Sequence, residues 1–243
     1  MPSSEPSPTP ASKSAVERLI GVFFAPGEIF ADIARSPGFV LPLVLIMILS
    51  LASSTIVTNR VGIENIVRQQ MMKSPRTAEL PKEQLDQAVE RGAKFAGFFV
   101  YATPIFVPIG MLVIAGVMIM MANFVFGGTS NFKQMFATVA HASFPPGVVT
   151  IILSLVIVFL KDPADLDVQN LLAANLGILI SAETSRFLHR LAMSMDFFSF
   201  WQIGLLATGI SAAANLSFTK ALLSVAIPWA IWILGAAGLA AAF

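Results

Sequence analysis

Histidine is the residue type here whose chemistry is easiest to recognise, and the chain has only two, His141 and His189. They lie on different predicted elements, and two are too few for a histidine metal site unless carboxylates join them. His141 falls in an apolar stretch, where a histidine is a candidate functional site by default. The alternative is a hydrogen-bonded side chain facing the membrane interface. The lack of cysteine excludes disulfides, thiolate metal sites and a cysteine nucleophile.

Other motifs that could do chemistry are weak. Gly127-Gly128-Thr129 has the glycines of a phosphate-binding loop but not its lysine, so we interpret it as a tight turn between helices. Glu183, Arg186, His189 and Arg190 could bind an anion or a lipid headgroup, although a solvated helix face is the simpler interpretation. No HExxH, GxSxG or P-loop pattern is present. The sequence predicts a non-enzymatic protein without a catalytic, cofactor or metal site.

Composition indicates lipid as the main solvent. The chain is 56% hydrophobic and 12% charged, with a mean hydropathy of +0.79, whereas a soluble domain carries about 25% charged residues. A net charge of +1 gives no basic footprint for nucleic acid. The bilayer is therefore the one partner that composition predicts.

Charge-free apolar runs predict an all-α integral membrane protein with a bundle of five transmembrane helices. At about 1.5 Å per residue, a run must hold about 20 residues to cross a hydrocarbon core of roughly 30 Å. The predicted spans are 39–58, 95–126, 134–160, 197–219 and 221–243. The second and third form a helical hairpin around the turn at Gly127-Gly128, and Thr129 or Ser130 is expected to cap the third. Asn215 is expected to need a polar partner inside the fourth span.

The N-terminal segment before the spans predicts a disordered tail followed by interfacial helices. Residues 1–13 are rich in proline and serine, and a single membrane domain is expected to cover 14–243. Ser14 and Glu17 have the spacing of a capping box, and the apolar stripe after them is that of an amphipathic helix. Pro26 suits the start of a second helix with Ile29, Phe30 and Ile33 opposite Glu28 and Asp32. These helices are either interfacial anchors or a partner-binding element.

Short and interrupted segments lie between the spans. Residues 168–182 are apolar but too few to cross the bilayer, which predicts a short re-entrant or interfacial helix before the fourth span. Pro104 and Pro108 predict a kink in the second span, and Pro145-Pro146 an interruption of the third. Asp196 precedes the fourth span, where a helix N-terminus favours negative charge. Trp201 is expected at interfacial depth.

Three groups of residues, in this order, resemble the Yip-domain family, the Ypt/Rab GTPase-interacting membrane proteins and their bacterial relatives. They are Phe23-x-x-Pro26-x-x-x-Phe30-x-x-Ile33-x-x-x-Pro37, then Phe126-Gly127-Gly128-x-x-x-Phe132 with Ser143-x-x-Pro146, and lastly Asp196-x-Phe198-x-x-Trp201. The resemblance implies a five-span helical domain with a cytosolic N-terminus.

The resemblance also bears on partners. Eukaryotic members bind Rab GTPases, but their aspartate-leucine-tyrosine-glycine stretch before the first span is absent here. His141 and Ala142 stand where tyrosine is common in the family. The sequence therefore resembles a bacterial-type member in the cytoplasmic membrane, and a Rab-type GTPase is not an expected partner.

Charge distribution argues against the orientation that the family implies. With the N-terminus inside, the inner segments hold five Lys/Arg and the outer segments ten, seven of them in residues 60–94. The positive-inside rule alone would place the N-terminus outside. That polar region also holds five Asp/Glu, so we follow the whole-pattern resemblance and expect a cytosolic N-terminus.

Two functions remain open from the sequence. The first is a membrane-organising or partner-binding adaptor, because the apolar core shows no titratable centre and amphipathic elements flank it. The second is a small-molecule or ion transporter or channel, because its paired prolines and the segment 168–182 are typical of the discontinuous helices that build carrier sites.

Overall fold

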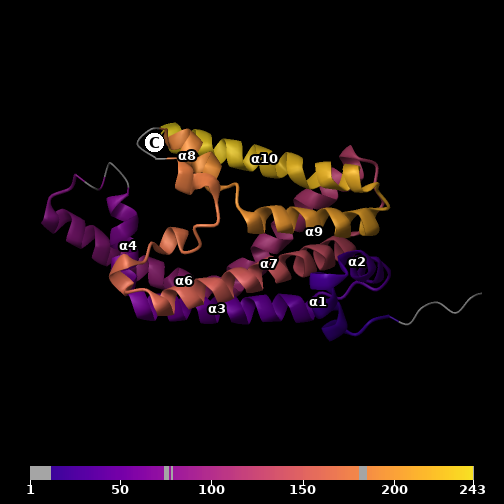
Figure 1. Cartoon of the computed structure of the whole chain (residues 1–243), viewed down its shortest axis with the longest axis horizontal. Coiled ribbons are helices and arrows are strands. Elements are labelled where there is room, and N and C mark those ends of the chain that lie inside the picture. The colour runs from indigo at the N-terminus through magenta and orange to yellow at the C-terminus, as the bar shows by residue number, and fades with distance from the viewer. Residues whose placement is uncertain (1–11, 74–76, 78, 181–184, 243) are drawn as a thin grey trace, which may run out of the picture.

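The computed structural model describes residues 12–73, 77, 79–180 and 185–242. Its described part is helical and holds five helices long and apolar enough to cross a membrane, which confirms the predicted fold class. The five are α3 (Val40–Val61), α6 (Lys82–Ile119) continued by the π-helical turn η1 (Met120–Val125), α7 (Phe132–Leu160), α9 (Phe197–Ala214) and α10 (Phe218–Ala242). They run side by side (Figure 1).

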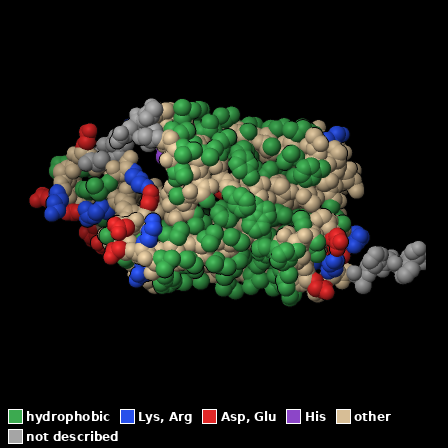
Figure 2. Space-filling model, viewed as in Figure 1, with side chains coloured by type: hydrophobic (Ala, Val, Ile, Leu, Met, Phe, Trp, Pro, Cys, Tyr) green, Lys and Arg blue, Asp and Glu red, His purple; other side chains and the backbone are tan. Residues whose placement is uncertain are grey.

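A belt of apolar side chains surrounds the bundle, and the charged side chains gather at its two ends (Figure 2). The shorter helices lie towards those ends: α1 (Ala15–Phe24) and α2 (Pro26–Arg35) at one, α4 (Ile63–Met72) at the other (Figure 1). The chain is therefore an integral, multi-pass membrane protein, with α1 and the C-terminal end of α10 at opposite ends of the bundle.

Local sequence signals place several helix starts as predicted. The Ser14 side chain accepts from the Glu17 amide and Glu17 accepts from the Ser14 amide, which completes the capping box of α1. Pro26 occupies the first position of α2. For α7 the expected cap is wrong, because Asn131 rather than Thr129 or Ser130 forms a capping box with Gln134.

The fourth predicted span is wrong at its end. α9 stops at Ala214 because Asn215 adopts a left-handed backbone, with φ of 54°, a conformation that asparagine tolerates better than most residues. Residues 218 and 219 already belong to α10. The other helix bounds differ from the predicted spans mainly at α6, which starts at Lys82 because the preceding polar helix continues into the span.

Residues 168–180 do not form the expected short helix. They hold two 3-10 turns, η3 (Val168–Asn170) and η4 (Leu176–Leu179), after a first such turn, η2 (Pro163–Asp165). The Asp167 and Asn175 side chains accept from the amides of Gln169 and Gly177. Such local side-chain bonds compete with a helix. Residues 181 and 182 lie outside the described residues, and an amphipathic helix, α8 (Arg186–Met193), follows.

The paired prolines do not interrupt the helices that contain them. α6 continues through Pro104 and Pro108, and α7 continues through Pro145 and Pro146 to give one helix of 29 residues. The predicted interruption of the third span is therefore wrong. Pro145 and Pro146 are buried against neighbouring elements of the bundle, where packing can stabilise a helix despite the amide that each proline lacks.

Contacts between α3 and α7 set the depth of residues in the bundle. The Phe39 ring, just before α3, packs against Phe136 of α7 at 4.9 Å between centroids. At the other end of α3, the Arg60 side chain donates to the carbonyl of Val158 at 3.1 Å. The 22 residues of α3, about 33 Å long, thus match the part of α7 from Phe136 to Val158.

A glycine on α9 lets three helices meet closely. A Cβ atom at Gly209 would lie 2.4 Å from Thr138 of α7 and 2.9 Å from the ring of Phe30 of α2. Both neighbours are almost fully buried. Phe30, a residue singled out from the sequence, therefore packs between α2 and α9 in the core.

We predict that Gly209→Ala lowers the thermal midpoint of the purified protein, because the added methyl group overpacks this contact by about 1–3 kcal/mol. Gly204→Ala in the same helix is the matched control, since a Cβ there meets nothing within 4 Å. The control should be neutral or stabilising by up to about 1 kcal/mol. Equal midpoints for the two variants in the same detergent would contradict the packing described.

Candidate functional site

The residues singled out from the sequence fall into three places. Pro26, Phe30 and Trp201 lie at or beside the junction of α1 and α2 with the bundle. Gly127, Gly128 and Asn215 meet at one end of the bundle. Ser143, Pro146 and Asp196 line a cavity. His141 belongs to none of these and lies in the core.

A buried ion pair joins α1 to α2. The Arg18 Nε atom donates to Asp32 Oδ2 at 2.8 Å, and the two side chains are 7% and 2% exposed. Arg18 also donates to the carbonyl of Ser36 at 2.8 Å and to the Ser12 hydroxyl at 2.7 Å. The sequence placed Asp32 opposite Phe30, and Asp32 is nevertheless buried, because Arg18 neutralises its charge inside the protein.

The pKa of Asp32 reflects opposing influences. Burial alone would raise the pKa of this carboxyl. The hydrogen bond and charge of Arg18, with the Lys13 amide and the Arg35 guanidinium, outweigh burial and hold the pKa below its ordinary value. The carboxylate is thus the form that stabilises the fold.

Aromatic side chains continue this junction into the bundle. The ring of Phe23 on α1 packs edge-on against Phe144 of α7 at 6.2 Å and against Trp201 of α9 at 6.1 Å. Trp201 also lies beside Phe197. The tryptophan expected at interfacial depth is therefore part of the surface on which α1 packs.

The turn at Gly127-Gly128 packs against the C-terminal end of α9. Gly127 has φ of +76°, a backbone that favours glycine, and a Cβ at Gly128 would lie 2.9 Å from the Cβ of Ala214. The Thr129 amide donates to the Ala214 carbonyl at 3.1 Å. Asn215 is exposed and its side chain donates to the Thr129 hydroxyl at 3.4 Å. Its partner is thus outside the helix, and the expectation of a polar contact within the span was wrong.

His141 is buried inside α7 and is 1% exposed. Its Nδ1 atom lies 2.9 Å from the Ala137 carbonyl one turn earlier. The expectation of an interface-facing side chain was wrong, although the expected hydrogen bond is present. Among the residues that the structure describes, no group of three His, Asp or Glu side chains could hold a metal ion.

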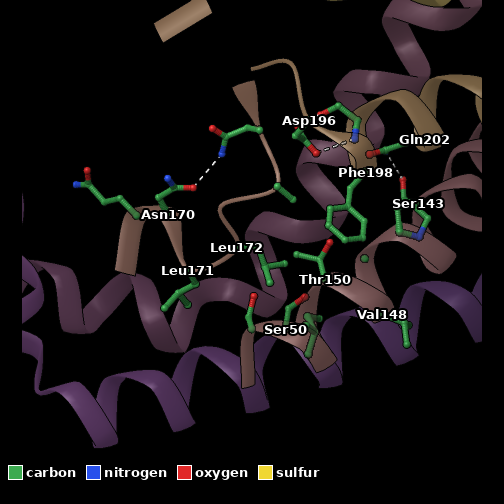
Figure 3. A pocket seen from close by; sticks show the side chains of 18 of the residues that line it. Ser50, Ser143, Val148, Thr150, Asn170, Leu171, Leu172, Asp196, Phe198 and Gln202 are labelled. Carbon is green, nitrogen blue, oxygen red and sulfur yellow. Dashed lines mark hydrogen bonds between the residues drawn. The ribbon is translucent and has the colours of Figure 1, made fainter. Parts of the chain in front are cut away.

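A cavity of about 650 Å³ lies between α3, α7, α9 and the segment before α8. Figure 3 shows the Thr150 side chain from α7 close to Phe198 from α9, and Asp196 and Gln202 above them. The polar side chains among its lining residues are Ser50, Ser143, Thr150, Ser154, Gln169, Asn170, Asn175, Arg190, Asp196, Ser199 and Gln202. Such a lining is unusual for an apolar bundle and makes the cavity our candidate site.

Hydrogen bonds fix the depth of this cavity. The Gln202 side chain donates to the Ser143 hydroxyl at 3.0 Å, so these residues of α9 and α7 are level. Asp196 caps α9 by accepting from the Ser199 amide and hydroxyl, and it lies about 9 Å further along the helix axis than Gln202. That is about level with Thr150, which lies roughly 12 Å along α7 from Val158. Asp196 therefore lies inside the apolar belt, although its place before the fourth span suggested an edge position.

Comparison with known families decides what this architecture is. A family model of the Yip1 domain matches residues 20–239. The chain belongs to the Yip1-domain family. Comparisons with curated proteins and with solved structures gave no match. The match runs from α1 into α10, so the family assignment covers all five spans and confirms the resemblance drawn from the motifs.

Sequence reasoning on this Yip1-domain chain missed other polar residues that line the cavity with Asp196. Ser50 and Thr150 are isolated polar residues in apolar runs, and Gln202 directly follows Trp201 of the third motif. Each is a weak signal by itself, because serine and threonine are common in membrane helices. Their coincidence depends on the relative depths of α3, α7 and α9, which no local pattern encodes.

The Arg18–Asp32 pair gives a prediction for stability. We expect Asp32→Asn to lower the free energy of unfolding by about 3–5 kcal/mol at pH 7, because it leaves a buried guanidinium without its countercharge. The pKa of Asp32 is lowered by folding, so its contribution is present above the ordinary aspartate pKa of about 4 and is lost as the pH falls below it. Wild type and variant should therefore converge in acid.

Glu28→Gln is the control, because Lys13–Glu28 is an exposed pair, worth less than about 1 kcal/mol. Unfolding in one detergent would be followed at pH 7 and down to pH 3. A gap between wild type and Asp32→Asn that stays constant over this range, or equal losses in the two variants, would contradict the assigned role.

Proposed function

We propose that this Yip1-domain protein is a non-enzymatic adaptor that organises a bacterial cytoplasmic membrane by binding a partner protein. The proposed recognition element is the pair α1–α2, facing the cytosol. The partner would be a peripheral or membrane protein other than a Rab-type GTPase. The single observation that supports this most is the division of α1 into a fixed face and a free apolar face.

The fixed face holds α1 in one position relative to the bundle. Leu19 and Val22 are buried, and Arg18 bonds Asp32 and the Ser36 carbonyl. Through Phe23, α1 also contacts α7 and α9, and both of these helices are membrane spans. A helix held in this way can present a surface of defined shape, as a binding element requires.

The free face carries large apolar side chains. Val16, Ile20 and Phe24 are 59%, 58% and 83% exposed, one above the other on α1. Glu17, between Val16 and Ile20 in the sequence of α1, is an exposed charge beside them. An apolar strip with a charged border is typical of a protein-binding surface and also of an anchor in the headgroup layer, so the test must separate the two.

We predict that a photoreactive amino acid at Ile20 cross-links a protein in intact membranes, since this side chain is exposed on the free face. The same probe at Leu19, which is buried, is the matched control and should yield adducts only within the chain. The products would be analysed by electrophoresis and mass spectrometry. Lipid adducts alone at position 20 would indicate a plain interfacial anchor and would refute the adaptor function.

A carrier function is the second candidate, and the polar cavity at mid-depth favours it. Carriers bind solutes where a helix begins inside the membrane, and α9 begins at the cavity. His141 and Asn215, two further polar residues of the apolar runs, do not line it. Asp196 and Gln202 are therefore the residues whose substitution would test transport.

For an adaptor we expect no transport by the purified protein in liposomes. Uptake of radiolabelled ethanolamine, choline and amino acids would be measured against empty liposomes, with Asp196→Asn and Gln202→Leu in parallel. Saturable uptake by wild type that either substitution abolishes would instead establish the carrier function. Asn215→Ala serves as the control, because that side chain lies at the end of the bundle.

A further inference from the structure

The cavity holds polar groups whose hydrogen-bonding capacity is not used within the described part of the chain. Ser50 and Thr150, near mid-depth on α3 and α7, and Ser154, one turn further along α7, line the cavity. Within the described residues no side chain or carbonyl bonds their hydroxyls. Polar groups at this depth are costly unless something binds them, so their concentration on one wall indicates a ligand with polar atoms.

Two opposite charges line the same cavity without pairing. Asp196 accepts two hydrogen bonds from Ser199, which leaves about half of its acceptor sites for a ligand. Arg190 projects from the short helix α8, and in the described ranges no carboxylate, that of Asp196 included, lies within 4.0 Å of its guanidinium. A ligand that carries a positive and a negative group can satisfy both residues at once, whereas a singly charged ligand leaves one unpaired.

We propose that the cavity binds the headgroup of a zwitterionic phospholipid with a primary ammonium and a phosphate, the chemistry of phosphatidylethanolamine. The ammonium lies on Asp196 and the phosphate on Arg190. A primary ammonium has three N–H donors. The Asp196 carboxylate, the Gln202 amide oxygen and the Thr150 hydroxyl are acceptors beside it. Gln202 is suitably oriented because its NH₂ group already donates to Ser143.

The surroundings favour a lipid over a soluble zwitterion. An apolar belt surrounds the bundle (Figure 2), and Ile46, Leu49 and Ile151 contribute apolar lining beside the hydroxyls of the cavity. These side chains suit the glycerol and the first methylenes of the acyl chains. A volume of about 650 Å³ falls in the range of pockets that enclose a small ligand, which is enough for the headgroup while the chains remain in the bilayer.

The same geometry predicts selectivity. A choline headgroup has no N–H donor for Asp196, and its three methyl groups would face hydroxyls. An anionic glycerol headgroup brings no positive charge, so its phosphate could bind Arg190 while the Asp196 carboxylate stayed unpaired. Of the three headgroups compared, the ethanolamine headgroup is the one that can pair with both Asp196 and Arg190.

The test is a titration of the full-length protein in detergent, followed by native mass spectrometry. The probes are phosphatidylethanolamine, phosphatidylcholine and phosphatidylglycerol with identical acyl chains, and soluble phosphoethanolamine. We expect phosphatidylethanolamine to bind at least ten-fold more tightly than the other two lipids. Soluble phosphoethanolamine should compete only weakly, because it lacks the apolar contacts.

Variants identify the site. Asp196→Asn keeps a helix-capping side chain and should weaken binding of phosphatidylethanolamine at least ten-fold with little effect on phosphatidylglycerol. Arg190→Gln should weaken both. Arg186→Gln is the matched control, since Arg186 is an exposed arginine on α8 that does not line the cavity. Thermal midpoints would verify folding of each variant.

Several outcomes would overturn the proposal. They are equal affinity for the choline and ethanolamine lipids, unchanged binding in both Asp196→Asn and Arg190→Gln, and binding of soluble phosphoethanolamine without binding of the lipid. The titration does not involve the free face of α1. Failure of the titration would therefore leave the adaptor function untouched. Failure of the cross-linking test would likewise leave the proposed lipid site untouched.

Discussion

The shortness of the fourth span, α9, constrains the rest of this structure. α9 has 18 residues, about 27 Å, beside α7 with 29 residues, about 43 Å. One end of α9 is fixed at the end of the bundle, where the Thr129 amide donates to the Ala214 carbonyl. The other end must therefore begin inside the apolar belt. Its first amides need an acceptor there, because lipid offers none, and Asp196 supplies it.

Because α9 begins inside the apolar belt, the chain segment before it must also enter the belt. The Leu176 amide donates to the Met195 carbonyl at 3.2 Å and the Phe197 amide donates to the Ala174 carbonyl at 3.4 Å. This short antiparallel contact satisfies backbone groups of a segment that is not helical at this point. The space beside it, facing α3 and α7, is the polar cavity. The cavity thus follows from the length of α9 and not from any motif.

The sequence predicted the structure correctly where it depends on residues that are neighbours in the chain. Apolar runs gave five spans, and Ser14 with Glu17 gave the start of α1. It did not predict the burial or depth of a residue where these depend on contact between elements that are far apart in the chain. Asp32 sits on a polar stripe, and only its position against Arg18 makes burial favourable. Asn215 lies in an apolar run, and only its backbone shows that it ends a helix. The depth of Asp196 likewise depends on the bond between Gln202 and Ser143.

The packing of α1 and α2 decides how their function can be examined. Deleting them would remove Phe30 from its contact with Gly209 and would uncover apolar surface on α7 and α9. A truncated chain that failed to bind a partner would then report the loss of a core, because large apolar side chains in such positions contribute roughly 3–5 kcal/mol each. Point changes on the free face avoid this problem, since Ile20 and Phe24 are exposed. The two helices are therefore part of the membrane bundle, and only their outer side chains can be changed without changing the fold.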